Sequence, residues 1–149
     1  MTTELTLAEL EAAAGLELEP SDWVTIEQRA IEQFADATGD HQWIHVDPAR
    51  AAQGPFGTTV AHGYLSLSLL PGLLGSMLSV TDARMGINYG IEKVRFTAPV
   101  PSGSRVRLKA VIRSAERRGE GVLYHVGAEV EIEGADKPAM VGEVVYLVF

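Results

Sequence analysis

The sequence predicts an α+β fold in which an antiparallel sheet wraps around one long, apolar central helix. Two patterns carry this prediction. No Asp, Glu, Lys or Arg occurs between Ala51 and Thr81, and the apolar part of that stretch reads as a helix. The last third of the chain alternates apolar and polar residues with a period of two, which is typical of half-buried strands. Because a helix that is apolar on nearly every side must be enclosed, the sheet is expected to curl around it.

The N-terminal region predicts a short helix followed by a short strand. Thr6 and Glu9 form a capping box ahead of "LAELEAAA", and Gly15 is expected to end that helix. "DWVTI" then favours a strand. The region has no basic segment and is not expected to be a secretory signal.

Two further helices flank a loop. The first is expected over residues 27–37, where apolar side chains recur at helical spacing, with Gly39 as its C′ glycine. The second is expected to begin with Asp47 as N-cap and Pro48 at the first helical position, and to run to Gln53. The intervening residues are expected to be non-helical.

The central helix is predicted in "YLSLSLLPGLLGSMLSV", residues 64–80. Pro71 is expected to interrupt or kink it, because proline lacks an amide donor and crowds the preceding turn. A membrane span needs about 20 apolar residues, and this stretch is shorter and contains glycines. A helix buried inside a sheet is therefore the preferred interpretation.

An antiparallel sheet of four or five strands is expected around this helix, and four strands are clear from the pattern. They are "GINYGIEKVRFTA", "RVRLKAVIR", "VLYHVGAEVEI" and "AMVGEVVYLVF", the last three joined by turns at "ERRGEG" and "EGADKP" that suit antiparallel hairpins. The inward-facing positions are expected to be Val106, Leu108, Ala110 and Ile112 in one strand, and Val122, Tyr124, Val126, Ala128, Val130 and Ile132 in the next. One sheet around one helix leaves an uncovered edge, so a homodimer is expected.

Composition excludes several classes of function. With no cysteine, the chain forms neither disulfides nor thiolate metal sites and has no cysteine nucleophile. A net charge of −8 disfavours nucleic-acid binding, which depends on clustered Lys and Arg. No repeat or linker interrupts the sequence, so residues 1–149 are expected to form one domain. The expected location of the protein is cytoplasmic.

Asp40, His41, Trp43 and His45 lie within six residues of the loop between the two helices. Surface loops rarely carry so much titratable and aromatic chemistry. Taken singly, Asp40 reads as a turn residue after a helix, and His45 as a packed, hydrogen-bonded side chain. Taken together, the residues either cap and pack or react.

Metal binding is one competing use of these side chains. On a helix, His41 and His45 would share one face, with Asp40 and Asp47 nearby as oxygen ligands. Because Asp47 and Pro48 indicate a non-helical segment, no metal site is expected.

Three stretches resemble one known family. "FADATGDHQWIHVDPARAA" resembles the hydratase signature of the MaoC-like (R)-specific enoyl-CoA hydratases, and "TTVAHGYLSLSLL" resembles their entry into the central helix. "GINYGIEKVRFTAPVPSGSRVR" resembles their following strand and turn. The similarity spans Trp23 to Arg107 and is greatest to the NodN-like single-domain subgroup. It implies a single hot dog fold.

The resemblance also implies an activity. Family members add water reversibly to a trans-2-enoyl-CoA, giving a (3R)-3-hydroxyacyl-CoA in fatty acid metabolism without a metal or redox cofactor. Asp40 and His45 match the catalytic pair that shares one water, and Gly63 matches the position whose backbone amide holds the thioester oxygen. We expect Asp40 to accept the water proton, while His45 positions the water and returns a proton on the same face.

Further residues are expected to contact substrate. Trp43, which with Gln42 replaces the Asn-Pro common in the family, is expected to wall the acyl pocket. His62, Tyr64 and Asn88 are further candidates, and a packing or hydrogen-bonding role is preferred for His62. Two histidines are expected to be structural, His41 facing solvent and His125 on a strand. Five basic residues could contact the phosphates of the coenzyme A nucleotide, although residues at such spacings are otherwise typical of solvated strand faces. They are Arg84, Lys93, Arg95, Arg105 and Arg107.

Two other functions remain open. The same fold could act as an acyl-CoA thioesterase, with a carboxylate directing water to the thioester carbon. It could also be a non-catalytic acyl-binding or partner subunit. The spacing of Asp40 and His45, and the presence of both, speak against these alternatives.

Overall fold

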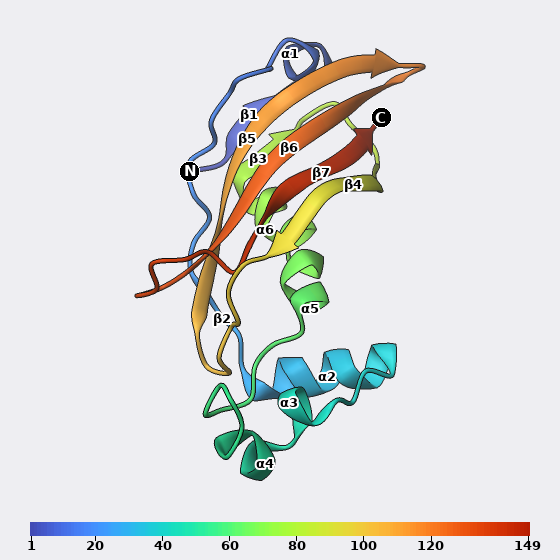
Figure 1. The fold of residues 1–149 in the computed structure, drawn as a ribbon. Coiled ribbons are helices and arrows are strands. Elements are labelled where there is room, and N and C mark those ends of the chain that lie inside the picture. The colour runs from blue at the N-terminus through green and yellow to red at the C-terminus, as the bar shows by residue number, and fades with distance from the viewer.

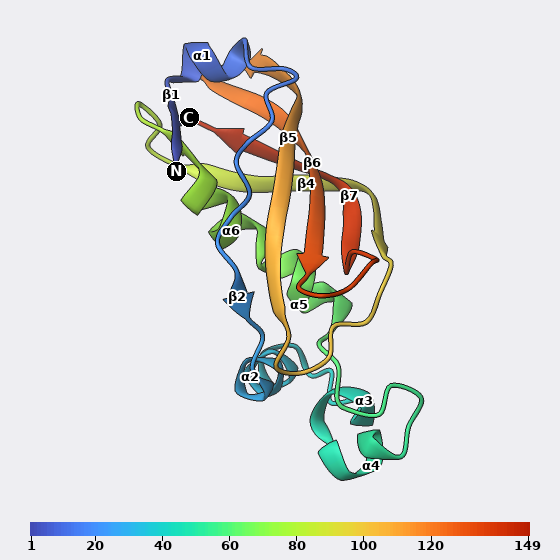
Figure 2. The same cartoon turned by 90° about the vertical axis from the view of Figure 1, so that its left-hand side faces the viewer.

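The computed structural model describes residues 1–149 as a curved antiparallel sheet with a pair of apolar helices packed against one of its faces (Figure 1 and Figure 2). The elements in chain order are β1 (Thr3–Leu5), α1 (Leu7–Glu11), β2 (Val24–Thr25), α2 (Gln28–Thr38), α3 (Trp43–Val46), α4 (Pro48–Ala52), α5 (Gly63–Ser68), α6 (Leu70–Met77), β3 (Leu78–Val80), β4 (Gly86–Phe96), β5 (Arg105–Arg118), β6 (Gly121–Ile132) and β7 (Met140–Val148). The predicted α+β class, with its antiparallel sheet around a central helix, is confirmed.

The main sheet has the strand order β2-β5-β6-β7-β4, with all neighbours antiparallel. The alternation read from the sequence sets its inner face, since every residue predicted to point inward in β5 and β6 is buried. These side chains and the apolar faces of α5 and α6 form most of one cluster of 27 buried residues. The strand β5 continues past the predicted end at Arg113 to Arg118, so the first hairpin turns at Gly119 and Glu120.

The central helix is divided into α5 and α6, and Pro71 lies in the first turn of α6. The predicted interruption at this proline is confirmed. The predicted end at Val80 is wrong, because the backbone becomes extended at Leu78 (φ −135°, ψ 128°). Leu78–Val80 form β3, which pairs in parallel with β1 from the start of the chain. None of the helices is both long and apolar enough to cross a membrane.

The local capping signals act as expected. Thr6 and Glu9 form the capping box of α1, although that helix ends at Glu11, before the predicted Ala14. Gly39 ends α2 in the left-handed conformation (φ 80°), where the absence of a side chain avoids strain. The Asp47 side chain accepts a hydrogen bond from the Arg50 amide and so caps α4.

The strand β4 lies at an edge of the sheet, and nearly all of its residues are exposed. It pairs with β7 along one edge only. Its apolar side chains Ile87, Tyr89 and Ile91 are 44%, 54% and 55% exposed. We call this strand the β4 edge.

Candidate active site

The loop between α2 and α4 contains one unexpected turn of helix, α3 (Trp43–Val46). The His45 amide donates to the Gln42 carbonyl (2.9 Å) and the Asp47 amide to the Trp43 carbonyl (3.0 Å). The prediction that this segment is non-helical was wrong. Pro48 holds Asp47 in an extended conformation (φ −118°, ψ 88°) but leaves the preceding residues free to form a turn. This turn directs His45 into the protein.

His45 is buried, and one of its ring nitrogens is committed to the backbone. Nδ1 lies 2.6 Å from the Val60 carbonyl oxygen, which can only accept, so Nδ1 carries the hydrogen and donates it. The Val60 amide in turn donates to the Ile44 carbonyl (3.0 Å). In the neutral ring, Nε2 therefore carries the lone pair.

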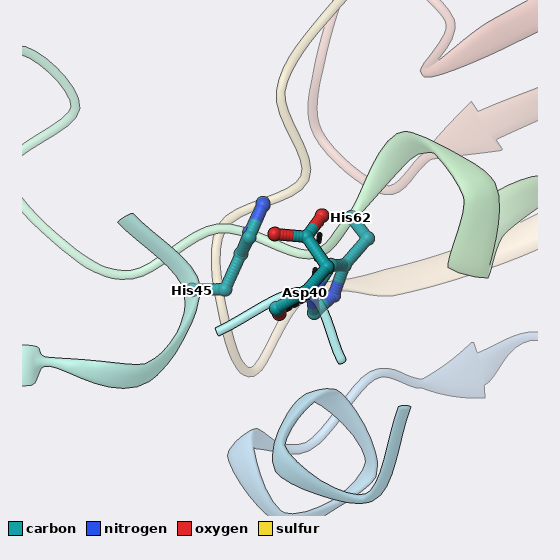
Figure 3. Close-up of side chains that lie close together, drawn as sticks. All are labelled: Asp40, His45 and His62. Carbon is teal, nitrogen blue, oxygen red and sulfur yellow. Dashed lines mark hydrogen bonds and ion pairs between the residues drawn. The ribbon is translucent and has the colours of Figure 1, made fainter. Parts of the chain in front are cut away.

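Asp40 follows the end of α2 and keeps its carboxylate half-exposed. Its carboxylate, a ring nitrogen of His45 and a ring nitrogen of His62 lie within 4.8 Å of one another (Figure 3). Because hydrogen bonds to water are about 2.8 Å long, one water can bridge two acceptors separated by this distance. The predicted pair, Asp40 and His45, is therefore brought together in a geometry that can hold a single water.

His62 precedes α5 and joins the other two side chains, as Figure 3 shows. It is 3% exposed. Its Nε2 lies 2.9 Å from the backbone oxygen of Asp40, and its ring stacks on His45 with centroids 3.8 Å apart and planes 22° apart. The Phe34 ring packs against it from α2 at 4.9 Å. The expected packing and hydrogen-bonding role of His62 agrees with these contacts.

Gly63 is the first residue of α5, and its amide donates to no acceptor within the chain. The first amides of a helix are unpaired and point outward, so this donor is available to a ligand. A Cβ at this position would lie 2.8 Å from the Phe96 ring. The glycine therefore lets Phe96 approach the helix start closely.

A cavity of about 320 Å³ lies beside His45 and Gly63. Ile44, Phe56 and Phe96 supply much of its apolar wall. Trp43 does not line it. The indole packs over Gly54, and the Arg50 guanidinium lies 4.3 Å from the ring centroid.

The two other predicted substrate contacts are on or near β4. Tyr64 is 67% exposed and meets Phe96 edge-on, with ring centroids 5.8 Å apart. Asn88 lines a second cavity of about 320 Å³, between the central helix and the sheet, with Pro71 and Tyr146. The structure thus gathers Asp40, His45, His62 and Gly63 and sets Asn88 at a different cavity.

The metal pair considered from the sequence does not form, since His41 is exposed and bonds Asp36 (2.9 Å). That hydrogen bond raises the pKa of His41. Asp40, His45 and His62 offer another possible ligand set. However, His45 Nδ1 and His62 Nε2 already face carbonyl oxygens. Only the Asp40 carboxylate and the other two ring nitrogens would therefore be available as metal ligands.

Two of the arginines considered for phosphate binding, and His125, lie on the sheet. Arg107 forms an ion pair with Glu131 of the neighbouring strand β6 (2.6 Å), and Arg105 forms one with Glu133, the residue that follows β6 (3.0 Å). The Arg107 hydrogen bond lowers the pKa of Glu131. These two arginines are therefore engaged within the sheet. His125 lies 3.7 Å from a carboxylate oxygen of Glu143.

Sequence reasoning missed three apolar residues of the site. In the sequence, Phe34 is only one of the apolar residues at helical spacing within residues 27–37, and Phe56 and Phe96 carried no signal of their own. Phe96 ends β4, and its approach to Gly63 joins residues 33 positions apart. The glycine at the start of a helix was the only local sign that something packs closely there.

Comparison with known proteins agrees with this arrangement. Residues 9–133 match the MaoC like domain. The chain is 55% identical over 144 residues to the 3-hydroxyacyl-thioester dehydratase Z of Mycobacterium tuberculosis, covering 96% of this chain and 95% of the relative. It is 47% identical to Nodulation protein N of Rhizobium leguminosarum, covering 92% and 87% of the two chains.

Among solved structures, the unliganded R-hydratase PhaJ1 from Pseudomonas aeruginosa is similar, with a TM-score of 0.75 and 26% identity over 97% of this chain and 85% of the hydratase. The expected hot dog fold, the resemblance to NodN-like proteins and the hydro-lyase class of enzyme are thereby confirmed. The chain belongs to the MaoC-like domain family.

Proposed function

We propose that the protein catalyses the reversible, (R)-specific hydration of a trans-2-enoyl-CoA to a (3R)-3-hydroxyacyl-CoA. One observation carries the proposal: Asp40 and His45 come within reach of a single water, beside a cavity that His45 and Gly63 line. The 55% identity to a 3-hydroxyacyl-thioester dehydratase supports the same substrate class, since dehydration is the reverse reaction.

In the proposed reaction, the Asp40 carboxylate and His45 Nε2 each accept a hydrogen bond from one water. The water oxygen bonds to the β-carbon as its proton passes to Nε2. The imidazolium then returns that proton to the α-carbon on the same face. This revises the expected roles of the pair. Because Nδ1 of neutral His45 is committed to Val60, its Nε2 must accept a proton before it can donate one.

Between the two proton transfers, negative charge collects on the thioester oxygen. The free Gly63 amide supports the proposal that this oxygen is held at the start of α5. Preorganised donors of this kind stabilise developing charge most strongly where water is excluded. All atoms of the reaction are supplied by water and the enoyl thioester, so the proposed chemistry needs no metal or redox cofactor.

We further propose that the protein is a homodimer paired along the β4 edge. A long edge strand with unpaired backbone groups and the exposed apolar side chains Ile87, Tyr89 and Ile91 is a surface that proteins ordinarily cover. A second copy related by a two-fold axis would present the same strand, and the two would extend the sheets into one.

The test is to incubate the protein with crotonyl-CoA and to follow the conjugated enoyl absorbance together with free thiol. Loss of absorbance without thiol release supports hydration. Thiol release supports the thioesterase alternative, and no change supports a non-catalytic binding or partner subunit.

Variants of the pair then test the roles of its members. Asp40→Asn and His45→Ala should each lower kcat at least 100-fold, since general acid–base groups typically contribute about 10²–10⁴-fold. His41→Ala is the matched control, because His41 lies in the same loop but bonds only the exposed Asp36. Near-wild-type turnover in either Asp40→Asn or His45→Ala would overturn the mechanism.

A further inference from the structure

We propose that His62 is a positioning residue that fixes the placement of Asp40 relative to His45. The inference rests on the proposed function, because it concerns how the water-activating pair is held. The sequence indicated only a packing or hydrogen-bonding role for this side chain. The contacts assign it a more specific one.

The His62 ring contacts both members of the pair at once. Its Nε2 bonds the backbone oxygen of Asp40 at 2.9 Å, and its face covers the His45 ring at 3.8 Å. Asp40 and His45 lie on different segments, the end of α2 and the turn α3, and no hydrogen bond joins their side chains directly. His62 is therefore a physical link between them.

The same residue connects the pair to the Gly63 amide, which is proposed to hold the thioester oxygen (the oxyanion position). His62 is the N-cap of α5, and the next residue is Gly63, whose amide is free. A displacement of His62 would move the backbone on which that amide is carried. One buried ring thus sets the spacing of all three groups that the reaction needs.

The hydrogen bonding of His62 argues against a purely space-filling role. Its Nδ1 is the one buried side-chain nitrogen or oxygen atom in the chain without a hydrogen-bond partner. Leaving a buried polar atom unpaired costs stability, and an apolar ring would fill the same space without that cost. The useful atom is Nε2, which must carry the hydrogen because the Asp40 carbonyl can only accept.

His62 is not placed to exchange protons with substrate. Its Nε2 is 4.0 Å from the nearer Asp40 carboxylate oxygen and already donates to the backbone, and the ring is 3% exposed. Its effect is expected on the alignment of Asp40 and His45. Misplacement of reacting groups by about 1 Å can lower rates roughly 10²-fold.

Two substitutions separate the two contacts. His62→Phe keeps an aromatic ring against His45 and removes the donor to Asp40. His62→Gln keeps an amide donor near the position of Nε2 and removes the ring. We expect His62→Phe to lower kcat on crotonyl-CoA at least tenfold with KM changed less than threefold, and His62→Gln to recover part of that loss. His125→Gln, which changes a histidine of β6 outside the proposed site, should match wild type.

A second measurement does not depend on activity. Nitrogen-15 NMR of the full-length protein should find the neutral His62 ring protonated at Nε2 and bare at Nδ1, and His62→Phe should shift the His45 ring signals. A His62 ring protonated at Nδ1, or a His62→Phe variant with wild-type kcat, would overturn the inference. If wild type itself fails to hydrate crotonyl-CoA, the proposed function fails, and the NMR result still decides whether His62 holds the pair.

Discussion

A methyl group added at residue 63 probes the oxyanion position at the start of α5. In Gly63→Ala, the new Cβ would lie 2.8 Å from Cγ and Cδ2 of the Phe96 ring and 3.1 Å from Cε2. Carbon atoms in contact are ordinarily about 3.5–4.0 Å apart. Either the ring must turn or the start of α5 must move. If the Phe96 ring turns, the new methyl group still lies beside the path of the thioester, whereas a shift of α5 would carry the Gly63 amide with it.

The expected loss follows from what the amide is proposed to do. Removing one oxyanion donor costs about 2.7–4 kcal/mol of activation free energy, or roughly 10²–10³ in kcat. Gly63→Ala keeps the amide but displaces it or obstructs the approach of the thioester, so we expect kcat to fall about 100-fold.

The assay is turnover of crotonyl-CoA by Gly63→Ala, by Gly75→Ala and by the double variant Gly63→Ala/Phe96→Ala. Gly75 is the matched control, since it is exposed on α6 and a Cβ there meets nothing within 4 Å. If the double variant recovers turnover, the loss in Gly63→Ala comes from the clash with the Phe96 ring. If it does not, the loss comes from the methyl group blocking the approach of the thioester. Wild-type turnover in Gly63→Ala alone would refute the placement of the oxyanion at this amide.

Two other predictions concern assembly and pH. Ile91→Lys should convert a dimer into a folded monomer by placing a charge on the β4 edge, as measured by sedimentation with circular dichroism as the folding control; a monomeric wild type would contradict the pairing. Burial raises the pKa of Tyr124 and raises the pKa of Tyr146 to about 12. Both pKa values are higher in the folded state than the unfolded value near 10. The two neutral tyrosines therefore stabilise the folded state fully below about pH 10, and this stabilisation is lost as the pH rises through 12. Alkaline titration of tyrosinate absorbance should therefore show two tyrosines that ionise only with unfolding, and ionisation of all four before unfolding would contradict their burial.

The features predicted well from the sequence are those determined by neighbouring residues. The capping box of Thr6 and Glu9, the left-handed Gly39 and the Asp47 cap each act within about one helical turn. The alternation in β5 and β6 is likewise a property of consecutive residues, and it predicted the buried face of the sheet correctly. Asp40, His45 and Gly63 were identified through a resemblance to related sequences, because their convergence depends on the fold.

The features missed depend on contacts between distant residues. β3 is a three-residue segment, Leu78–Val80, that continues a helical pattern in the sequence, and it is a strand only because β1, 75 positions earlier in the chain, pairs with it. The stacking of His62 on His45 joins positions with no shared periodicity. Trp43 was expected at the acyl pocket, but the turn α3 directs Ile44 toward the cavity and leaves the indole over Gly54.

The division between sheet and helices has a consequence for how the molecule loses activity. The helices α2, α3 and α4 lie at one end of the sheet (Figure 1), and the cluster of 27 buried residues includes none from α3 or α4. Regions with few buried apolar contacts open at lower free energy than the core strands. His45 depends on α3 for its orientation, so a sub-global opening of this end would separate it from Asp40 while β5, β6 and β7 stay paired. Mild denaturant should therefore abolish turnover, and expose the α3 and α4 amides to hydrogen exchange, before the sheet unfolds.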